Sequence, residues 1–160
     1  MVRVGLIGFG LAGQAFHAPM IRGVKGMELA CVLERHTNHA KQRYPDVRIA
    51  HSLDELLSDK SINLVVVATP NDSHYSYAKA ILEADRHVVV DKPLTPTMKE
   101  AEEPVRLAAQ RQELFSVYQD RRWDGAFITV KKLDESGVQG TVMEYEARFD
   151  RFRLGAKPNA

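Results

Sequence analysis

The chain has 160 residues, near the usual size of one compact domain, and its 44% hydrophobic content is enough to bury a core. Lys and Arg number 22 against 21 Asp and Glu, so a formal charge of +1 provides no overall field for nucleic acid or an anionic membrane. The single cysteine, Cys31, excludes an internal disulfide framework, and no apolar run reaches membrane-spanning length. We therefore expect a soluble, cytoplasmic protein with a small-molecule partner and no metal ion.

Short apolar runs rich in β-branched residues recur along the chain and predict six strands. They cover residues 2–7, 27–33, 47–50, 64–67, 87–90 and 114–117. Most of these runs are nearly all apolar, without a polar residue at every second position, which is typical of strands covered on both faces. Because helix-like segments lie between them, the sequence predicts an α/β fold with a doubly wound parallel sheet.

Two of the intervening helices have recognisable start signals. The polar run at residues 71–73, with Asn71 as a helix cap, predicts a helix over residues 75–83. Thr97, followed three residues later by a glutamate, is a capping-box pattern before a helix over residues 101–112. A proline lies inside this second segment, at position 104, and predicts a kink or a later helix start.

The composition changes after residue 120, which indicates a first domain over residues 1–120 and the start of another over 121–160. In the second part we expect a helix over residues 125–136 and, after a glycine turn, a strand-like segment over 141–152. The last residues have no periodicity and are expected to form a loose tail. An unpaired strand edge would favour pairing with another copy, so we expect a homo-oligomer.

A glycine-rich loop follows the first predicted strand directly and opens a helix, the context that makes a GxGxxG pattern a useful signal for dinucleotide binding. Its six residues are Gly8, Phe9, Gly10, Leu11, Ala12 and Gly13. Gly8 permits the tight turn, Gly10 lets a pyrophosphate approach the backbone, and Gly13 lets the helix pack closely on the strand. The phosphates would lie at the helix N-terminus. The alternatives are a glycine turn without a ligand and an adenosyl-methionine site, and the later Lys92 argues against the second.

Glu34 lies about 20 residues after the glycine loop, where a carboxylate commonly accepts from the ribose hydroxyls of NAD. The adjacent Arg35 could instead pair with the additional phosphate of NADP or stack on adenine. We expect NAD because a carboxylate repels a phosphate dianion, and NADP stays open. The alternative interpretation is that both residues are ordinary solvated charges at a strand end.

Ligands of open parallel sheets bind beyond the carboxyl ends of the strands, so the polar segments 68–74 and 91–93 should line the site. The cofactor-binding candidates in these segments are Thr69, Pro70, Asn71, His74, Asp91 and Lys92. Lys92 is also the catalytic candidate, because an ammonium over a nicotinamide can orient a substrate hydroxyl and stabilise negative charge that develops on oxygen. The alternatives are a surface lysine in a turn and, for His74, simple packing within its helix.

Two further side chains receive structural interpretations. His17 shares a helix face with Gly13, and Pro19 is expected to bend that helix. Cys31 lies within an apolar predicted strand and is best interpreted as a small core residue.

The blocks quoted above resemble the Gfo/Idh/MocA oxidoreductases, a family that includes glucose-fructose oxidoreductase and inositol dehydrogenases. The resemblance is carried by the glycine loop with residues 16–19, by segment 68–74, and by the Asp-Lys-Pro at 91–93, where the family usually has Glu-Lys-Pro. Segments 121–124 and 149–153 look like the subgroup that contains scyllo-inositol dehydrogenases. Within that subgroup glycine is common at the position of Asp85, and asparagine at the position of Asp120.

This resemblance implies a Rossmann domain and hydride transfer between NAD(P) and a hydroxyl of a sugar or polyol, with Lys92 acting at the substrate oxygen. It also implies that Asp91, Arg122 and Trp123 lie near the nicotinamide. The family's second domain supplies an acid-base histidine and an aspartate, and nothing after Phe152 matches them. We therefore expect a truncated chain that binds a dinucleotide weakly and is inactive alone. The alternative is a non-catalytic nucleotide-binding or interaction module.

Overall fold

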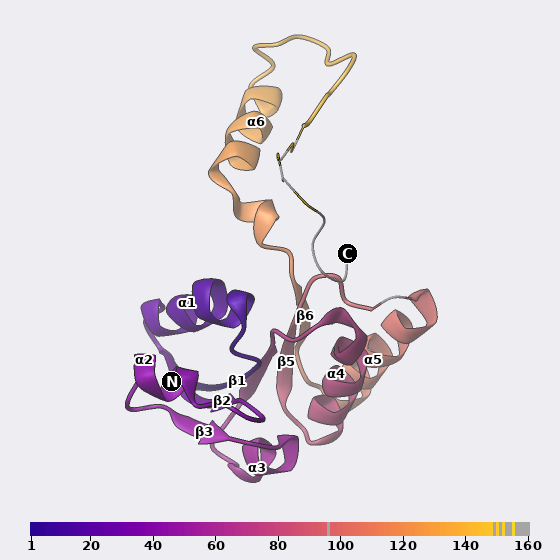
Figure 1. The fold of residues 1–160 in the computed structure, drawn as a ribbon. Coiled ribbons are helices and arrows are strands. Elements are labelled where there is room, and N and C mark those ends of the chain that lie inside the picture. The colour runs from indigo at the N-terminus through magenta and orange to yellow at the C-terminus, as the bar shows by residue number, and fades with distance from the viewer. Residues whose placement is uncertain (96, 149, 151, 153–154, 156–160) are drawn as a thin grey trace. The chain divides into compact units, whose positions relative to one another are not determined.

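The computed structural model describes residues 1–95, 97–148, 150, 152 and 155. The chain divides into two compact units, Met1–Gln119 and Asp120–Ala160. The first unit contains a parallel sheet of six strands, which Figure 1 shows with helices on its faces. The strands are β1 (Val2–Ile7), β2 (Met27–Leu33), β3 (Arg48–Ala50), β4 (Leu64–Val67), β5 (His87–Asp91) and β6 (Phe115–Tyr118). All six strands were expected from the sequence, and β3, β5 and β6 differ by one residue at one or both ends.

The strand order is β3-β2-β1-β4-β5-β6, and all five neighbouring pairs are parallel. The chain begins at the centre with β1, proceeds outward to β3, and then crosses to β4 on the other side of β1. This order is that of the doubly wound Rossmann fold and confirms the predicted fold class. It places the reversal of strand order between β1 and β4, where ligands of such sheets bind.

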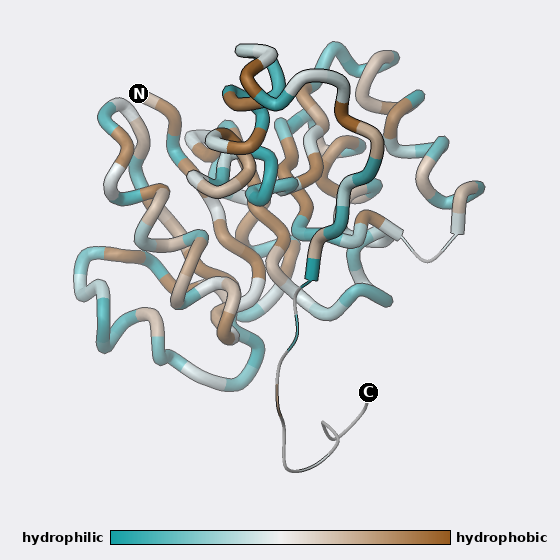
Figure 2. The backbone as a smooth tube through the Cα atoms, turned by 90° about the horizontal axis from the view of Figure 1, so that it is seen from above, coloured by the Kyte–Doolittle hydropathy of each residue, from teal (hydrophilic) through white to brown (hydrophobic). Residues whose placement is uncertain are grey.

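Helices complete the first unit between the strands. They are a π turn (Gly13–His17), α1 (Ala18–Gly23), α2 (His39–Arg43), α3 (Leu53–Ser58), a 3-10 turn (Asn71–Ser73), α4 (His74–Glu83) and α5 (Met98–Arg111). Two separate groups of buried side chains cover the two faces of the sheet. Adjacent residues of β1 show the division, because Leu6 belongs to one group and Ile7 to the other. Figure 2 shows the hydrophobic stretches and the hydrophilic segments between them along the backbone.

The helix after the glycine loop is widened by the π turn before Pro19. The N–H of Ala18 donates to the carbonyl of Gly13, five residues back, and Pro19 lies in the first turn of α1. A proline lacks the N–H of a regular helix, and its ring would clash with the carbonyl four residues earlier. The π turn thus lies directly before Pro19, while the bend expected at Pro19 stays a prediction.

Two of the expected helix details are wrong. Asn71 lies inside the 3-10 turn and caps nothing, and α4 begins at His74 without a capping side chain. Helix α5 begins at Met98 and continues through Pro104, so of the two alternatives expected there the later start is wrong and the kink stays a prediction. Thr97 is its N-cap as predicted, with its hydroxyl oxygen accepting from the N–H of Glu100 at 3.4 Å.

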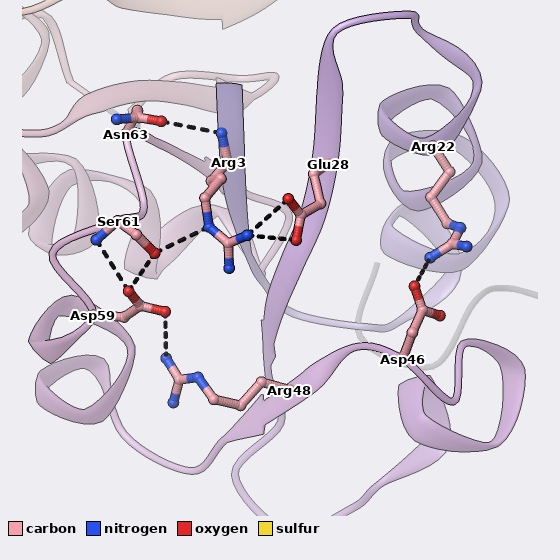
Figure 3. A network of polar contacts seen from close by, with 8 residues as sticks. All are labelled: Arg3, Arg22, Glu28, Asp46, Arg48, Asp59, Ser61 and Asn63. Atoms are coloured by element: carbon pink, nitrogen blue, oxygen red, sulfur yellow. Dashed lines mark hydrogen bonds and ion pairs between the residues drawn. The ribbon is translucent and has the colours of Figure 1, made fainter. Parts of the chain in front are cut away.

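A network of polar contacts ties β1 to its neighbours (Figure 3). The guanidinium of Arg3 donates to both carboxylate oxygens of Glu28 at 2.7 Å and to the hydroxyl of Ser61 at 3.0 Å. Its backbone N–H donates to the side chain of Asn63 at 3.1 Å. Ser61 also donates to Asp59 through its hydroxyl and its amide, and these bonds lower the pKa of Asp59. The network holds β1, β2 and the loop before β4 in register.

The second unit contains a 3-10 turn (Asp120–Trp123) and helix α6 (Gly125–Glu135), which confirms the helix expected over residues 125–136. The expected strand over residues 141–152 is wrong for its described part, because residues 142–148 have no regular structure. A strand needs a neighbour to pair its backbone groups, and the described residues of this unit include no other strand. Self-association therefore loses its expected basis and stays a prediction. Residues 149, 151 and 153 of the subgroup pattern, and 156–160 of the expected tail, lie outside the described residues.

Asp85 follows α4 in the left-handed region, with φ of 55°, a conformation that favours glycine. We expect Asp85→Gly to raise the free energy of unfolding by about 0.5 kcal/mol, because relief of the backbone outweighs loss of the exposed ion pair to Arg111. Asp85→Ala loses the same ion pair but keeps the strain, so it should be less stable than the parent. Urea unfolding of the three proteins measures the order, and equal stability of the glycine and alanine variants would contradict the argument.

Candidate functional site

A cavity of about 660 Å³ lies at the carboxyl ends of β1, β2 and β4, the position expected for a ligand of this fold. Three segments form it: the glycine loop after β1, the loop after β2, and the turn after β4 with the first part of α4. Its lining residues are 7–10, 33–37, 39, 69–70, 72–73 and 76–77. The site is thus built from segments that follow buried strands. Of the two polar segments expected to line it, residues 69–70 and 72–73 do so, whereas residues 91–93 do not.

Glycine occurs at three positions of the loop for different physical reasons. Gly8 has φ of +93°, and a Cβ on it would lie 2.7 Å from the carbonyl oxygen of Ala68. A Cβ on Gly13 would lie 2.3 Å from the carbonyl oxygen of Gly8. A Cβ on Gly10 would meet no protein atom within 4 Å. Packing of the chain therefore requires the first and the last glycine, whereas Gly10 leaves an open approach to the backbone.

The remaining loop residues divide between the core and the surface. Phe9 is buried and packs edge-on against the ring of Tyr44, with the ring centroids 6.2 Å apart. The side-chain amide of Gln14 donates to the Phe9 carbonyl at 2.7 Å and stabilises the turn. Leu11 is exposed and Ala12 half-buried, and neither lines the cavity. The loop thus presents backbone, with few side chains, to a ligand.

Glu34 lies at the end of β2, where it was expected, but its carboxylate is engaged by its own loop. One oxygen, Oε1, accepts from the hydroxyl of Thr37 at 2.6 Å and from the N–H of His39 at 3.2 Å. The other, Oε2, accepts from the N–H of Ala40 at 2.8 Å, and the residue is only 6% exposed. Glu34 therefore caps the N-terminus of α2. Its predicted contact with a ribose stays a prediction.

Arg35 is exposed and lines the cavity beside Glu34. Its Nη2 donates to the hydroxyl oxygen of Tyr77 at 2.8 Å, and this bond raises the pKa of the guanidinium above its usual range. Tyr77 belongs to α4, so the pair connects the loop after β2 with the helix after β4. Sequence reasoning missed Tyr77, together with His36, Thr37, His39 and Ser76. These residues directly follow the segments already selected or lie within one helical turn of them, and this proximity was the signal that could have identified them.

The turn after β4 is held by hydrogen bonds that involve Thr69 and His74. The hydroxyl of Ser73 donates to Thr69 Oγ1 at 2.7 Å. The ring of His74 is fully buried, with Nε2 2.8 Å from the carbonyl oxygen of Thr69 and Nδ1 2.7 Å from that of Pro93. His74 thus ties the turn after β4 to the segment after β5. Thr69 and Pro70 line the cavity, whereas Asn71 and His74 do not.

Asp91 and Lys92 follow at the end of β5. One carboxylate oxygen of Asp91, Oδ1, accepts from the backbone N–H of Lys92 at 2.8 Å. The other, Oδ2, lies 3.5 Å from Nε2 of His17, a buried residue of the π turn. Lys92 itself is exposed, and in the part of the chain that the structure describes its Nζ makes no hydrogen bond or ion pair. Neither Asp91 nor Lys92 lines the cavity, and the catalytic role of Lys92 stays a prediction.

His17 has more contact with the site than sequence reasoning assigned to it. Its ring packs against the ring of Tyr118 at the end of β6, with 4.5 Å between centroids. The Tyr118 hydroxyl in turn donates to the sulfur of Met20 at 2.8 Å. The first helix therefore contacts the ends of β5 and β6 as well as β1.

Arg122 and Trp123 belong to the second unit. There they line a hollow of about 340 Å³ with residues of α6, and Trp123 is 78% exposed. Their expected contact with a nicotinamide stays a prediction.

Three further observations concern metal ligands, membrane spans and the single cysteine in the described residues. No three His, Cys, Asp or Glu side chains among them gather closely enough to hold a metal ion. No helix in that part of the chain is long and apolar enough to cross a membrane. Cys31 is fully buried, and desolvation raises the pKa of its thiol to about 11, which confirms a core residue.

Residues 2–119 match a family profile described as an oxidoreductase family with an NAD-binding Rossmann fold. The chain is 46% identical to the uncharacterized oxidoreductase YdgJ of Escherichia coli strain K12, over 95% of this chain and 44% of that one. It is 36% identical to scyllo-inositol 2-dehydrogenase (NADP(+)) IolW of Bacillus subtilis strain 168, over 95% of this chain and 42% of that one. A crystal structure of a candidate oxidoreductase from Klebsiella pneumoniae matches with a TM-score of 0.91 at 42% identity, covering 95% of this chain and 44% of that one. The chain thus spans less than half the length of these relatives.

Because glycine occupies these positions for different physical reasons, adding one methyl group should have different effects at Gly13 and at Gly10. Gly13→Ala should lower the free energy of unfolding by about 2 kcal/mol or more, because backbone must move to relieve the contact with Gly8. Gly10→Ala should change it by less than about 0.5 kcal/mol. Urea unfolding followed by circular dichroism compares the two variants, and similar losses in both would show that packing requires Gly10 as well.

Proposed function

Because the chain belongs to the Gfo/Idh/MocA oxidoreductase family, whose matched domain has an NAD-binding Rossmann fold, we propose that its cavity binds a nicotinamide dinucleotide. The observation that carries this proposal is the open approach to Gly10, between two glycines that packing of the chain requires. A phosphate group can reach the backbone there, at the start of a helix, where N–H groups and the helix dipole favour an anion.

The residues around the cavity suggest how the cofactor would be held. Gly8, Gly10 and the start of the helix would bind the pyrophosphate, and the loop after β2 would receive the adenosine. The nicotinamide would extend toward Asp91 and Lys92 at the end of β5, and when bound it would supply the acceptor or donor of a hydride. Thr69 and Pro70, which line the cavity, would lie along the cofactor between these ends.

The substrate would be a hydroxyl of a sugar or polyol, an extension supported by relatives that are named inositol dehydrogenases. The ammonium of Lys92 would orient that hydroxyl and stabilise negative charge on its oxygen as the hydride leaves. Asp91 would hold the Lys92 backbone through its bond to the Lys92 N–H. We propose further that the 160 residues bind cofactor without turning over polyols, because the expected acid-base histidine matches nothing in them.

The sequence favours NAD as the cofactor because of Glu34. In the structure this carboxylate caps α2, so its position after β2 no longer supports NAD over NADP. The proposal therefore names the nicotinamide dinucleotides as a class.

Nucleotide binding to the 160-residue chain tests the proposal. Fluorescence of NADH and NADPH should change on binding, and Gly10→Ala should weaken binding at least about tenfold, because a Cβ would occupy the phosphate approach. Gly23→Ala is the matched control, since a Cβ at Gly23 also meets nothing within 4 Å but lies at the end of α1. Binding that is unaffected by Gly10→Ala would remove the glycine loop from the proposed site.

Catalysis by Lys92 is testable in a longer protein that contains these residues and turns over a polyol. Lys92→Met should lower kcat by at least about 100-fold while it changes cofactor affinity little, because the ammonium acts on charge that develops in the transition state. Lys99→Met, at an exposed lysine of α5, is the control. Equal turnover of the parent and Lys92→Met would show that Lys92 is a surface lysine without a catalytic role.

A further inference from the structure

We infer that the adenosine end of the cavity selects NADP over NAD, with Arg35 and Tyr77 together recognising the 2′-phosphate and Glu34 serving as a structural cap. The inference rests on the proposed function, because it concerns the nucleotide that the same cavity would bind.

The hydrogen-bonding capacity of Glu34 is mostly used within the chain. A carboxylate oxygen accepts about two hydrogen bonds, and Oε1 already accepts from Thr37 and His39. Recognition of NAD by a carboxylate uses its oxygens for the ribose hydroxyls. Only Oε2 retains capacity, beside its bond to Ala40, and the residue is 6% exposed. Glu34 is therefore a poor acceptor for a pair of ribose hydroxyls.

Turning Glu34 toward a ribose would also destabilise the start of helix α2. Helix α2 has no side-chain cap from its own N-cap residue, Asn38, so Glu34 satisfies the N–H groups at its start. Ala40 is fully buried, and its N–H would lose its partner if the carboxylate moved. A buried donor without an acceptor is unfavourable, so the cap should persist when a nucleotide binds.

Arg35 is positioned to recognise the adenosine ribose of the nucleotide in place of Glu34. Its guanidinium carries five N–H donors, and the contact with Tyr77 uses Nη2. The remaining donors form a fork that suits a phosphate group. The half-buried Tyr77 anchors this otherwise flexible side chain at the cavity, which reduces the entropy that binding must remove.

The charged residues that line the pocket are Arg35, Glu34 and Asp72. Three donors already surround the Glu34 carboxylate, which weakens its repulsion of a phosphate. Asp72 is exposed, so water and salt screen it. Arg35 is therefore the positive group that can contact a phosphate directly at the end of β2.

Calorimetric titration of the 160-residue chain with NADPH and NADH tests the inference. We expect NADPH to bind at least about tenfold more tightly, the size of one charge-assisted contact. Adenosine 2′,5′-bisphosphate should likewise bind more tightly than ADP, which places the preference at the ribose. Arg35→Gln should reduce NADPH affinity to that of NADH and leave NADH affinity unchanged. Tyr77→Phe, which keeps the ring but loses the acceptor, should remove part of the preference.

Two control variants separate this recognition from general effects. Arg43→Gln removes the same charge from a nearby residue that does not line the cavity, and should keep the preference. Glu34→Gln should lower thermal stability, because one oxygen that accepts hydrogen bonds is replaced by a donor, without weakening NADH more than NADPH.

The outcomes distinguish the inference from the proposed function. Binding of both nucleotides with NADH equal to or tighter than NADPH overturns the selection of NADP alone. A preference that survives Arg35→Gln overturns the role of Arg35. Failure of both nucleotides to bind would overturn the proposed function and this inference with it.

Discussion

The contact between Gly13 and the carbonyl oxygen of Gly8 is the constraint on which the site depends. An ideal Cβ on Gly13 would lie 2.3 Å from that oxygen, so the helix can start this close to β1 only without a side chain there. The close approach puts the beginning of the helix at the carboxyl ends of the strands and leaves Gly10 open. The geometry suited to a phosphate is therefore a consequence of how the helix packs on the strand.

The same helix also reaches the residues expected to act on a substrate. Its π turn, Gly13–His17, includes one more residue than a regular turn, which rotates the following side chains around the axis. His17 ends that turn 3.5 Å from Asp91, and Asp91 in turn holds the N–H of Lys92. The five residues of the π turn thus connect the glycine loop with the end of β5. A substitution in this turn should therefore change the structure of both the loop and the strand end.

The elements that the sequence predicts well are those with local causes. The apolar strands are recognisable because both of their faces are covered, as Leu6 and Ile7 show, and the glycine loop because its constraints act within a few residues. The contact of Arg35 with Tyr77 joins positions 42 residues apart, and nothing local indicates it. The strand expected over residues 141–152 is absent from its described part for a related reason, since β-propensity does not supply a partner strand.

Glu34 shows why an acidic residue after β2 is an incomplete indicator of the cofactor. Its distance from the glycine loop gives its place at the end of β2, but the same place adjoins the uncapped start of α2. A carboxylate has a limited number of acceptor sites, and backbone N–H groups of its own loop compete for them without any loss of ligand entropy. Where the helix cap wins, as it does here, the neighbouring Arg35 faces the cavity with its full charge. The presence of a carboxylate after β2 is therefore not enough to assign the nucleotide, because its oxygens can already be engaged by the chain itself.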